Sequence, residues 1–210
     1  GMQLGVIAEG LGMKVIYFDV ESKLPLGNAQ PKATLSSLLE EAHVVSLHVP
    51  QHASTELLIG KREIEQLRQG AMVINASRGN VVDLDALSEA LRSGRIGGAA
   101  IDVFPVEPRS NNDEFLSPLR GLDQCILTPH IGGSTEEAQE NIGVEVAEKL
   151  TRYSDNGTTI SAVNFPEVAL PEHDGKHRLL HVHRNIPGVM SAINKVFSEN
   201  NVNVSGQYLQ

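Results

Sequence analysis

Three polar side chains able to bind an anion or to move a proton each follow a short apolar run of this sequence. They are Arg78 in Ile74-Asn75-Ala76-Ser77-Arg78-Gly79, Glu107 in Asp102-Val103-Phe104-Pro105-Val106-Glu107, and His130 in Leu127-Thr128-Pro129-His130. Such runs are typical of buried strands, and α/β proteins place chemistry just past the carboxyl ends of these strands. We therefore expect the three side chains to meet at one edge of a sheet.

The side-chain types indicate the chemistry. A guanidinium binds a carboxylate through two parallel hydrogen bonds, and Gly79 beside Arg78 would let the backbone approach a ligand. A carboxylate next to an imidazole fixes its tautomer and favours the charged ring, which predicts Glu107 and His130 as an acid/base pair. Taken alone, Arg78 is equally consistent with a surface turn, and His130 with a structural histidine near a helix.

Asp19 is the candidate for nucleotide binding. It ends the apolar run Val15-Ile16-Tyr17-Phe18, and an acidic residue at the end of a second strand accepts hydrogen bonds from ribose hydroxyls in dinucleotide-binding folds. We expect the first strand of such a fold and its first two glycines to be missing, with Gly1 in the third glycine's place. A turn-forming or helix-capping role for Asp19 is the alternative.

The first 133 residues alternate apolar strands with helical patterns. We expect helices near residues 1–11, 35–41, 60–66 and 83–93, and strands over residues 14–19, 43–49, 72–75, 98–103 and 124–128. This alternation predicts the α/β class, with a Rossmann-type parallel sheet that lacks its first strand and has both faces covered. Residues 14–19 and 72–75 are expected to flank the vacant central position.

The remaining residues predict a second, smaller unit. Ser134 and Glu137 suggest a capping box at the start of a helix that ends near Tyr153. Pro166 and Pro171 lie in an extended linker, and a β-α-β pattern follows over residues 178–183, 187–199 and 202–208. The predicted organisation is a nucleotide-binding domain (1–133), an interdomain helix (134–157), a linker (158–177) and a partial domain (178–210).

Composition narrows the class of protein. The 210 residues carry a net charge of −9 and no dense basic run, which argues against nucleic acid and anionic membranes as partners. No apolar stretch approaches the roughly 20 residues of a membrane span, and we expect no signal peptide. The single cysteine, Cys125, fits a reducing, cytoplasmic compartment.

Together these segments resemble the D-isomer-specific 2-hydroxyacid dehydrogenase family. Within it they are most similar to the bacterial type that oxidises 3-phosphoglycerate and carries a C-terminal regulatory ACT domain. The resemblance runs the length of the chain and is carried by Ser46-Leu47-His48-Val49-Pro50, Ala99-Ala100-Ile101-Asp102, Thr128-Pro129-His130-Ile131-Gly132-Gly133-Ser134-Thr135, Glu137-Ala138-Gln139-Glu140-Asn141-Ile142-Gly143 and Tyr153-Ser154-Asp155-Asn156-Gly157.

The resemblance implies a role for each candidate residue. Arg78 would hold the substrate carboxylate, and His130 would be the acid/base with Glu107 as its partner. Asp19 would bind the adenosine ribose and favour NAD over NADP. The adenine-side wall would be His48, Val49 and Pro50, and the nicotinamide cradle would be Ala76, Asp102, His130, Gly132 and Gly133.

The C-terminal segment resembles the start of an ACT domain. In the family this surface binds serine, and the matching positions here are His183, Asn185 and Asn203. Amide side chains suit an amino acid because each offers donors and acceptors. Loop and strand-edge polar residues are the alternative interpretation.

The resemblance also predicts what this chain would lack. The front of the substrate domain and much of the ACT unit have no counterpart, so we expect negligible turnover and weak NAD binding by the chain alone, and self-association through the helix near residues 134–153 and the ACT-like strands. Two other functions stay open: another D-2-hydroxyacid dehydrogenase, and a non-catalytic nucleotide-binding or structural module.

Overall fold

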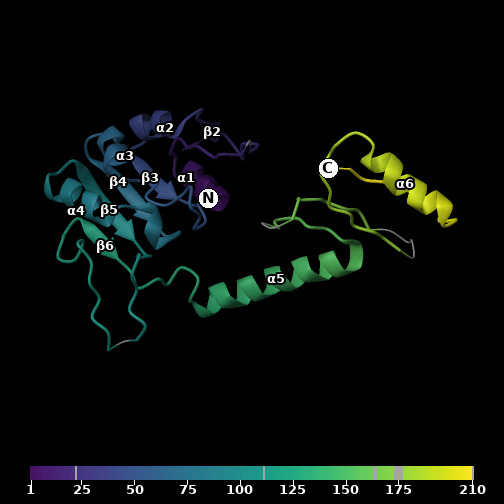
Figure 1. The fold of residues 1–210 in the computed structure, drawn as a ribbon. Helices are drawn as coiled ribbons and strands as arrows, with labels where there is room; N and C mark the ends of the chain where they lie inside the picture. The colour runs from purple at the N-terminus through teal and green to yellow at the C-terminus, as the bar shows by residue number, and fades with distance from the viewer. Residues whose placement is uncertain (22, 111, 163–164, 173–176, 210) are drawn as a thin grey trace. The chain divides into compact units, whose positions relative to one another are not determined.

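A computed structural model describes residues 1–21, 23–110, 112–162, 165–172 and 177–209. The chain divides into two compact units, Gly1–Thr135 and Glu136–Gln210. Figure 1 labels the helices and strands of both units.

Unit 1 contains two parallel sheets and the helices between their strands (Figure 1). The smaller sheet pairs β1 (Ile16–Tyr17) with β2 (Gln30–Pro31). The larger has the order β3-β4-β5-β6, formed by Val44–Leu47, Ala71–Asn75, Ile96–Ile101 and Cys125–Leu127. The helices are α1 (Met2–Gly10), α2 (Leu35–Glu41), α3 (Lys61–Gln66) and α4 (Leu84–Arg92), with a short 3₁₀ helix at Gly79–Val81. The predicted α/β class is confirmed.

The helices begin where polar side chains satisfy the first backbone N–H groups. The Thr34 hydroxyl accepts from the Ser37 amide at 3.1 Å and starts α2. The Asp83 carboxylate accepts from the Asp85 and Ala86 amides and starts α4. Leu87 and Leu91, one turn apart on α4, are fully buried, because their side chains point at the sheet. Local capping and an apolar helix face thus fix one covered side of the sheet.

Only one face of the larger sheet is fully buried. Val45, Val73 and Ala99 lie side by side on the covered face, at 5%, 0% and 6% exposure. On the other face, Val44, Met72 and Ile126 are 41%, 51% and 66% exposed. On the same face Ser46, Ile74 and Ala100 are half-buried, so among the described residues the expectation that both faces are covered holds fully for one face and only in part for the other. Apolar runs without alternation do not reveal whether a second layer is present.

Strand order differs from expectation in two ways. Residues 72–75 lie in the interior of the larger sheet, between β3 and β5, so they do not flank a vacant position; β3 and β6 are the edge strands of this sheet. A short strand, β2, which contains Pro31, is present where no strand was expected. Proline is tolerated there because only one side of an edge strand must pair.

Unit 2 begins with the long helix α5 (Glu136–Asn156). The predicted N-cap, Ser134, instead donates its hydroxyl to the His130 carbonyl oxygen at 3.1 Å. The helix runs past Tyr153 to Asn156 and is followed by Gly157, whose backbone is left-handed with φ 75°. Helix α6 (Val189–Glu199) follows Gly188. No described residue of 178–183 or 202–208 forms a paired strand, so those two predicted strands are wrong: a strand needs a hydrogen-bonded neighbour, and none of the described residues provides one.

Side-chain hydrogen bonds hold the segment after α5 in a compact arrangement, the clasp, formed by Thr158, Thr159, Arg178 and their backbone partners. The Thr158 hydroxyl donates to the Leu170 carbonyl oxygen and accepts from the Leu170 amide, and Thr159 makes the same kind of contact with Pro166 and Val168. Arg178 donates to the carbonyl oxygens of Asn156, at the end of α5, and Pro171. The predicted linker is thus folded onto the helix end where it is described; residues 163, 164 and 173–176 lie outside the described residues. Across the part of the chain that the structure describes, no helix is long and apolar enough to cross a membrane.

Candidate active site

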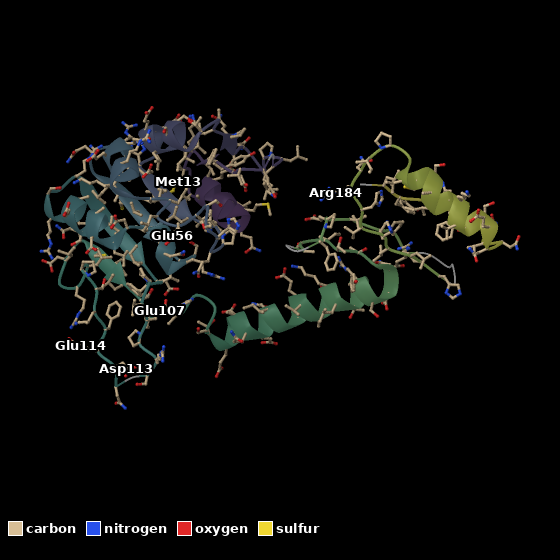
Figure 2. All side chains as sticks on the ribbon, viewed as in Figure 1. Met13, Glu56, Glu107, Asp113, Glu114 and Arg184 are labelled. Atoms are coloured by element: carbon tan, nitrogen blue, oxygen red, sulfur yellow. The ribbon has the colours of Figure 1, made fainter. Side chains whose placement is uncertain are left out.

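The carboxyl ends of the four parallel strands gather the candidate residues of unit 1. Since neighbouring strands run the same way, the loops after them open at one edge of the sheet. His48 follows β3, Ala76 and Arg78 follow β4, Asp102 follows β5 and His130 follows β6. Figure 2 places Glu107 early in the connection between β5 and β6, which continues through Asp113 and Glu114.

Glu107 and His130 form a direct contact although 23 residues separate them. The His130 Nδ1 lies 3.0 Å from one carboxylate oxygen of Glu107 and 2.9 Å from the other. An ionised carboxylate only accepts, so Nδ1 carries the proton and donates. The Nε2 lone pair is then free to accept a proton from a ligand. His130 itself has φ 54°, a left-handed backbone rare outside glycine and frequent at functional sites.

Asp102 organises the loop that carries His130. One of its oxygens accepts from the Thr128 hydroxyl at 2.5 Å and the Ile131 amide at 3.0 Å, and the other accepts from the Gly132 amide at 3.0 Å. Asp102 is 8% exposed. A buried carboxylate with three donors therefore fixes the residues on both sides of His130, including its unusual backbone.

Electrostatics keep both carboxylates ionised. Burial by itself would raise the pKa of Asp102, but the hydrogen bonds from Thr128, Ile131 and Gly132 outweigh it, and the pKa lies below its usual value. Burial by itself would also raise the pKa of Glu107. The hydrogen bond with His130 and the hydrogen bond from the Phe104 amide, 3.0 Å from Oε1, outweigh the effect of burial and lower this pKa. Glu107 therefore accepts from the His130 ring as a carboxylate, and Asp102 accepts as a carboxylate from the residues around it.

Asn75 and Gly79 shape the loop that presents Arg78. The fully buried Asn75 side chain accepts from the Ser77 amide and hydroxyl and donates to the Arg78 carbonyl oxygen at 2.9 Å. The Arg78 guanidinium is exposed and uses one N–H on the Ser77 carbonyl oxygen, which leaves further donors for an anion.

Gly79 approaches protein backbone and not a ligand. A Cβ at position 79 would lie 2.0 Å from the Phe104 carbonyl carbon and 2.5 Å from the Pro105 nitrogen. The expectation of a ligand-facing glycine is therefore corrected. Because Gly79 has no side chain, the loop that carries Arg78 packs directly on the backbone of Phe104 and Pro105. These residues begin the loop that carries Glu107, so the two loops are in direct contact.

The residues expected at the nucleotide are spread over both sheets of unit 1. Asp19 lies two residues beyond β1, and its Oδ1 accepts from the Glu21 amide at 3.0 Å, which is a turn-forming contact. The His48 Nε2 is 3.0 Å from the Ser46 hydroxyl, and burial lowers the His48 pKa. A Cβ on Gly132 would come within 3.2 Å of Asp102, whereas one on Gly133 would meet nothing within 4 Å.

The expected effector residues lie on both sides of α6 in unit 2. His183 and Asn185 precede the helix, and the His183 Nδ1 is 3.1 Å from the His181 Nδ1. Asn203 follows the helix, in a shallow pocket lined by Asn194, Phe197 and Val202. The structure does not join His183 to Asn203 by any contact that it describes.

Two organising residues escaped the sequence interpretation: Asn75 and Thr128. The available signal is a polar residue that follows or closes an apolar strand: Asn75 is fully buried and Thr128 half-buried, and a polar group withdrawn from water needs partners. Asp102 was placed beside the nicotinamide by resemblance, but its part in fixing the His130 loop appears only in the structure.

Comparisons with known proteins agree with this geometry. Residues 1–132 match the family described as D-isomer specific 2-hydroxyacid dehydrogenase, NAD binding domain, and residues 179–210 match an AHAS small subunit-like ACT domain. All 210 residues align with the D-3-phosphoglycerate dehydrogenases of Haemophilus influenzae, at 61% identity, and Escherichia coli K12, at 60%, covering 51% of each. The chain thus spans about half the length of these curated relatives.

Among solved structures, the NAD-complexed D-isomer specific 2-hydroxyacid dehydrogenase of Lactobacillus delbrueckii ssp. bulgaricus is similar. The TM-score is 0.65 and the identity 29%, over 78% of this chain and 53% of that one. The alignment extends over most of the chain, so the likeness is one of fold as well as of local sequence.

Proposed function

The chain belongs to the D-isomer specific 2-hydroxyacid dehydrogenase family, and we propose that it supplies the NAD-binding part and the catalytic side chains of a D-3-phosphoglycerate dehydrogenase. The reaction would be hydride transfer from C2 of 3-phospho-D-glycerate to NAD. The observation that carries the proposal is the contact between the His130 Nδ1 and Glu107, beside a loop that presents the exposed guanidinium of Arg78. The proposed divisions of the chain remain 1–133, 134–157, 158–177 and 178–210.

Each side chain would have a defined task. The His130 Nε2 removes the proton of the C2 hydroxyl, and Glu107 stabilises the charge that then resides on the ring. Arg78 binds the substrate carboxylate through its free N–H groups and so orients C2. Asp102 holds the His130 loop in place, and it remains ionised because its donors lower its pKa.

NAD would supply the acceptor for the hydride. The residues at the sheet edge suit a flat ring: the Ala76 methyl is small and exposed, and Gly132 has no side chain to enter the space beside Asp102. Asp19 has a second carboxylate oxygen besides the one bound to Glu21, which would accept from the ribose hydroxyls. His48, Val49, Pro50 and Gly133 would complete the nucleotide contacts, and a cytoplasmic location, consistent with the single Cys125, is proposed with them.

The sharpest test uses a chimera in which this chain replaces the matching half of the Haemophilus influenzae relative. We expect NADH formation from 3-phosphoglycerate, and a loss on the order of 10²–10⁴-fold in kcat/KM for His130→Ala. Arg78→Lys should raise KM for the substrate because the planar fork is lost. An active chimera indifferent to His130→Ala would contradict the proposal. Preference for lactate would favour another 2-hydroxyacid dehydrogenase, and nucleotide binding without turnover a non-catalytic module.

The C-terminal unit is proposed to bind serine and to take part in self-association. The ACT match over residues 179–210 suggests an amino-acid effector, with His183, Asn185 and Asn203 as contacts. The helix α5 exposes Ile142, Val144 and Leu150, at 47%, 56% and 63%, which favours an apolar partner such as a second copy. Calorimetry with L-serine on unchanged protein and Asn185→Ala tests the first point. Light scattering tests the second, and a monomer at micromolar concentration would contradict it.

A further inference from the structure

Two histidines of unit 2 point the same ring atom at each other. His181 and His183 are two residues apart, and their Nδ1 atoms are separated by 3.1 Å. The ring centroids are 5.1 Å apart and the planes are inclined by 42°, so the rings converge on one point without stacking face to face. The His181 carbonyl oxygen lies 3.4 Å from the same Nδ1 of His183. Three potential donor atoms, the two Nδ1 atoms and this carbonyl oxygen, therefore lie within 3.4 Å of the His183 Nδ1 or are that atom itself.

The separation of the two nitrogens matches the spacing of neighbouring ligands on one metal ion. With metal–nitrogen bonds of about 2.0–2.1 Å, the 3.1 Å separation corresponds to an angle of roughly 95–102° at the ion. This angle lies between the right angle of square-planar or tetragonal coordination and the tetrahedral angle. Tetragonal sites with nitrogen and oxygen ligands are typical of copper(II) and nickel(II).

We propose that His181 and His183 form a bidentate binding site for a divalent late transition metal, nickel(II) or copper(II), through their Nδ1 atoms. The His181 carbonyl oxygen and water would complete the coordination. A two-histidine site is modest, and the described residues contain no group of three or more His, Cys, Asp or Glu that could hold a metal ion. We therefore expect micromolar rather than nanomolar affinity, strongest for copper(II) because it leads the divalent series.

The competing explanation is a direct hydrogen bond in which one neutral ring donates to the other. Both explanations use the same atoms, but only chelation predicts a bound ion and a loss of binding when either ring is removed. The site does not rest on the proposed serine site. If His183 also contacts serine, an ion held there would compete with the amino acid for that ring.

The experiment is calorimetric titration of the untagged 210-residue chain with nickel chloride and, separately, with copper sulfate. We expect one ion per chain with micromolar affinity. His181→Gln and His183→Gln should each weaken binding on the order of tenfold or more, as loss of a ligand is at least as costly as loss of its supporting contacts. The matched control is His52→Gln, because His52 is exposed and its Nδ1 already contacts the Ser54 hydroxyl at 2.8 Å.

A spectroscopic readout separates a specific site from loose association. Electron paramagnetic resonance of the copper(II) complex should show two equatorial nitrogens, reduced to one in either glutamine variant. The proposal is overturned if no ion binds at micromolar concentration, if both variants bind as tightly as the unchanged chain, or if His52→Gln lowers affinity as much as they do. Circular dichroism that matches the unchanged chain shows that each variant is folded.

Discussion

Replacing Gly79 by alanine tests whether direct backbone packing holds the loop that carries Arg78 against the loop that carries Glu107. The added methyl would lie 2.0 Å from the Phe104 carbonyl carbon and 2.1 Å from its oxygen. Relief to an ordinary contact of about 3.5–4.0 Å requires a shift of roughly 1.5–2 Å in one of the two loops. Both contacted groups are backbone, so no side chain can rotate out of the way.

The expected cost follows from that shift. Overpacking typically destabilises by about 1–3 kcal/mol, and the backbone clash argues for the upper end. A loss near 3 kcal/mol lowers the melting temperature of a chain of this size by roughly 6–12 °C. Because Arg78 and Glu107 lie on the two displaced loops, kcat/KM of the chimera should fall by on the order of 10²-fold.

The assay is thermal denaturation of the chain, followed by NADH formation in the chimera. The control is Gly10→Ala in the same unit, where a Cβ would meet nothing within 4 Å. We expect that variant to melt with the unchanged chain. A Gly79→Ala chain that also melts within a degree or two of the unchanged chain, with undiminished chimera activity, would refute the packing argument.

Three further predictions concern neighbouring contacts. Asp102→Ala removes the acceptor of the Ile131 and Gly132 amides, so both should exchange hydrogen faster, and unchanged protection would count against the organising role of Asp102. The pKa of Glu107 is lowered in the fold, so its stabilisation is present above its unfolded value of about 4.3 and is lost as pH falls through the folded value. Urea midpoints should therefore drop more between pH 6 and pH 3.5 for the unchanged chain than for Glu107→Gln, and equal drops would contradict this. Arg178→Ala frees the carbonyl oxygens of Asn156 and Pro171 and should speed proteolytic cleavage after α5; an unaltered cleavage rate would show that the clasp holds without it.

The parts of the fold predicted best are those coded locally. Helices α2 and α4 lie within the expected ranges 35–41 and 83–93, and in the structure Thr34 and Asp83 cap them locally. Strands depend on partners elsewhere in the chain, which explains both the missed β2 and the absent strands around α6. Burial of the second sheet face also depends on what packs there, and the apolar runs could not reveal it.

The sequence predicts the residues of the candidate site, but not the hydrogen bonds and backbone contacts that hold them in position. The Glu107–His130 contact follows from placing a carboxylate and an imidazole after parallel strands that end at one edge. The three donors to Asp102 could not be read from the sequence, because two are backbone amides whose direction depends on the loop. The same holds for Gly79, whose neighbours in space are 25 and 26 residues away in sequence.

If Glu107 and His130 act as one acid/base unit, as proposed, a double-mutant cycle in the chimera will show it. Each single variant, Glu107→Ala and His130→Ala, should lower kcat/KM for 3-phosphoglycerate. Because Glu107 acts only through the ring that it contacts at 2.9 Å, the double variant should be no slower than His130→Ala alone. Losses that multiply in the double variant would show that the two side chains work independently and would rule out a single acid/base unit.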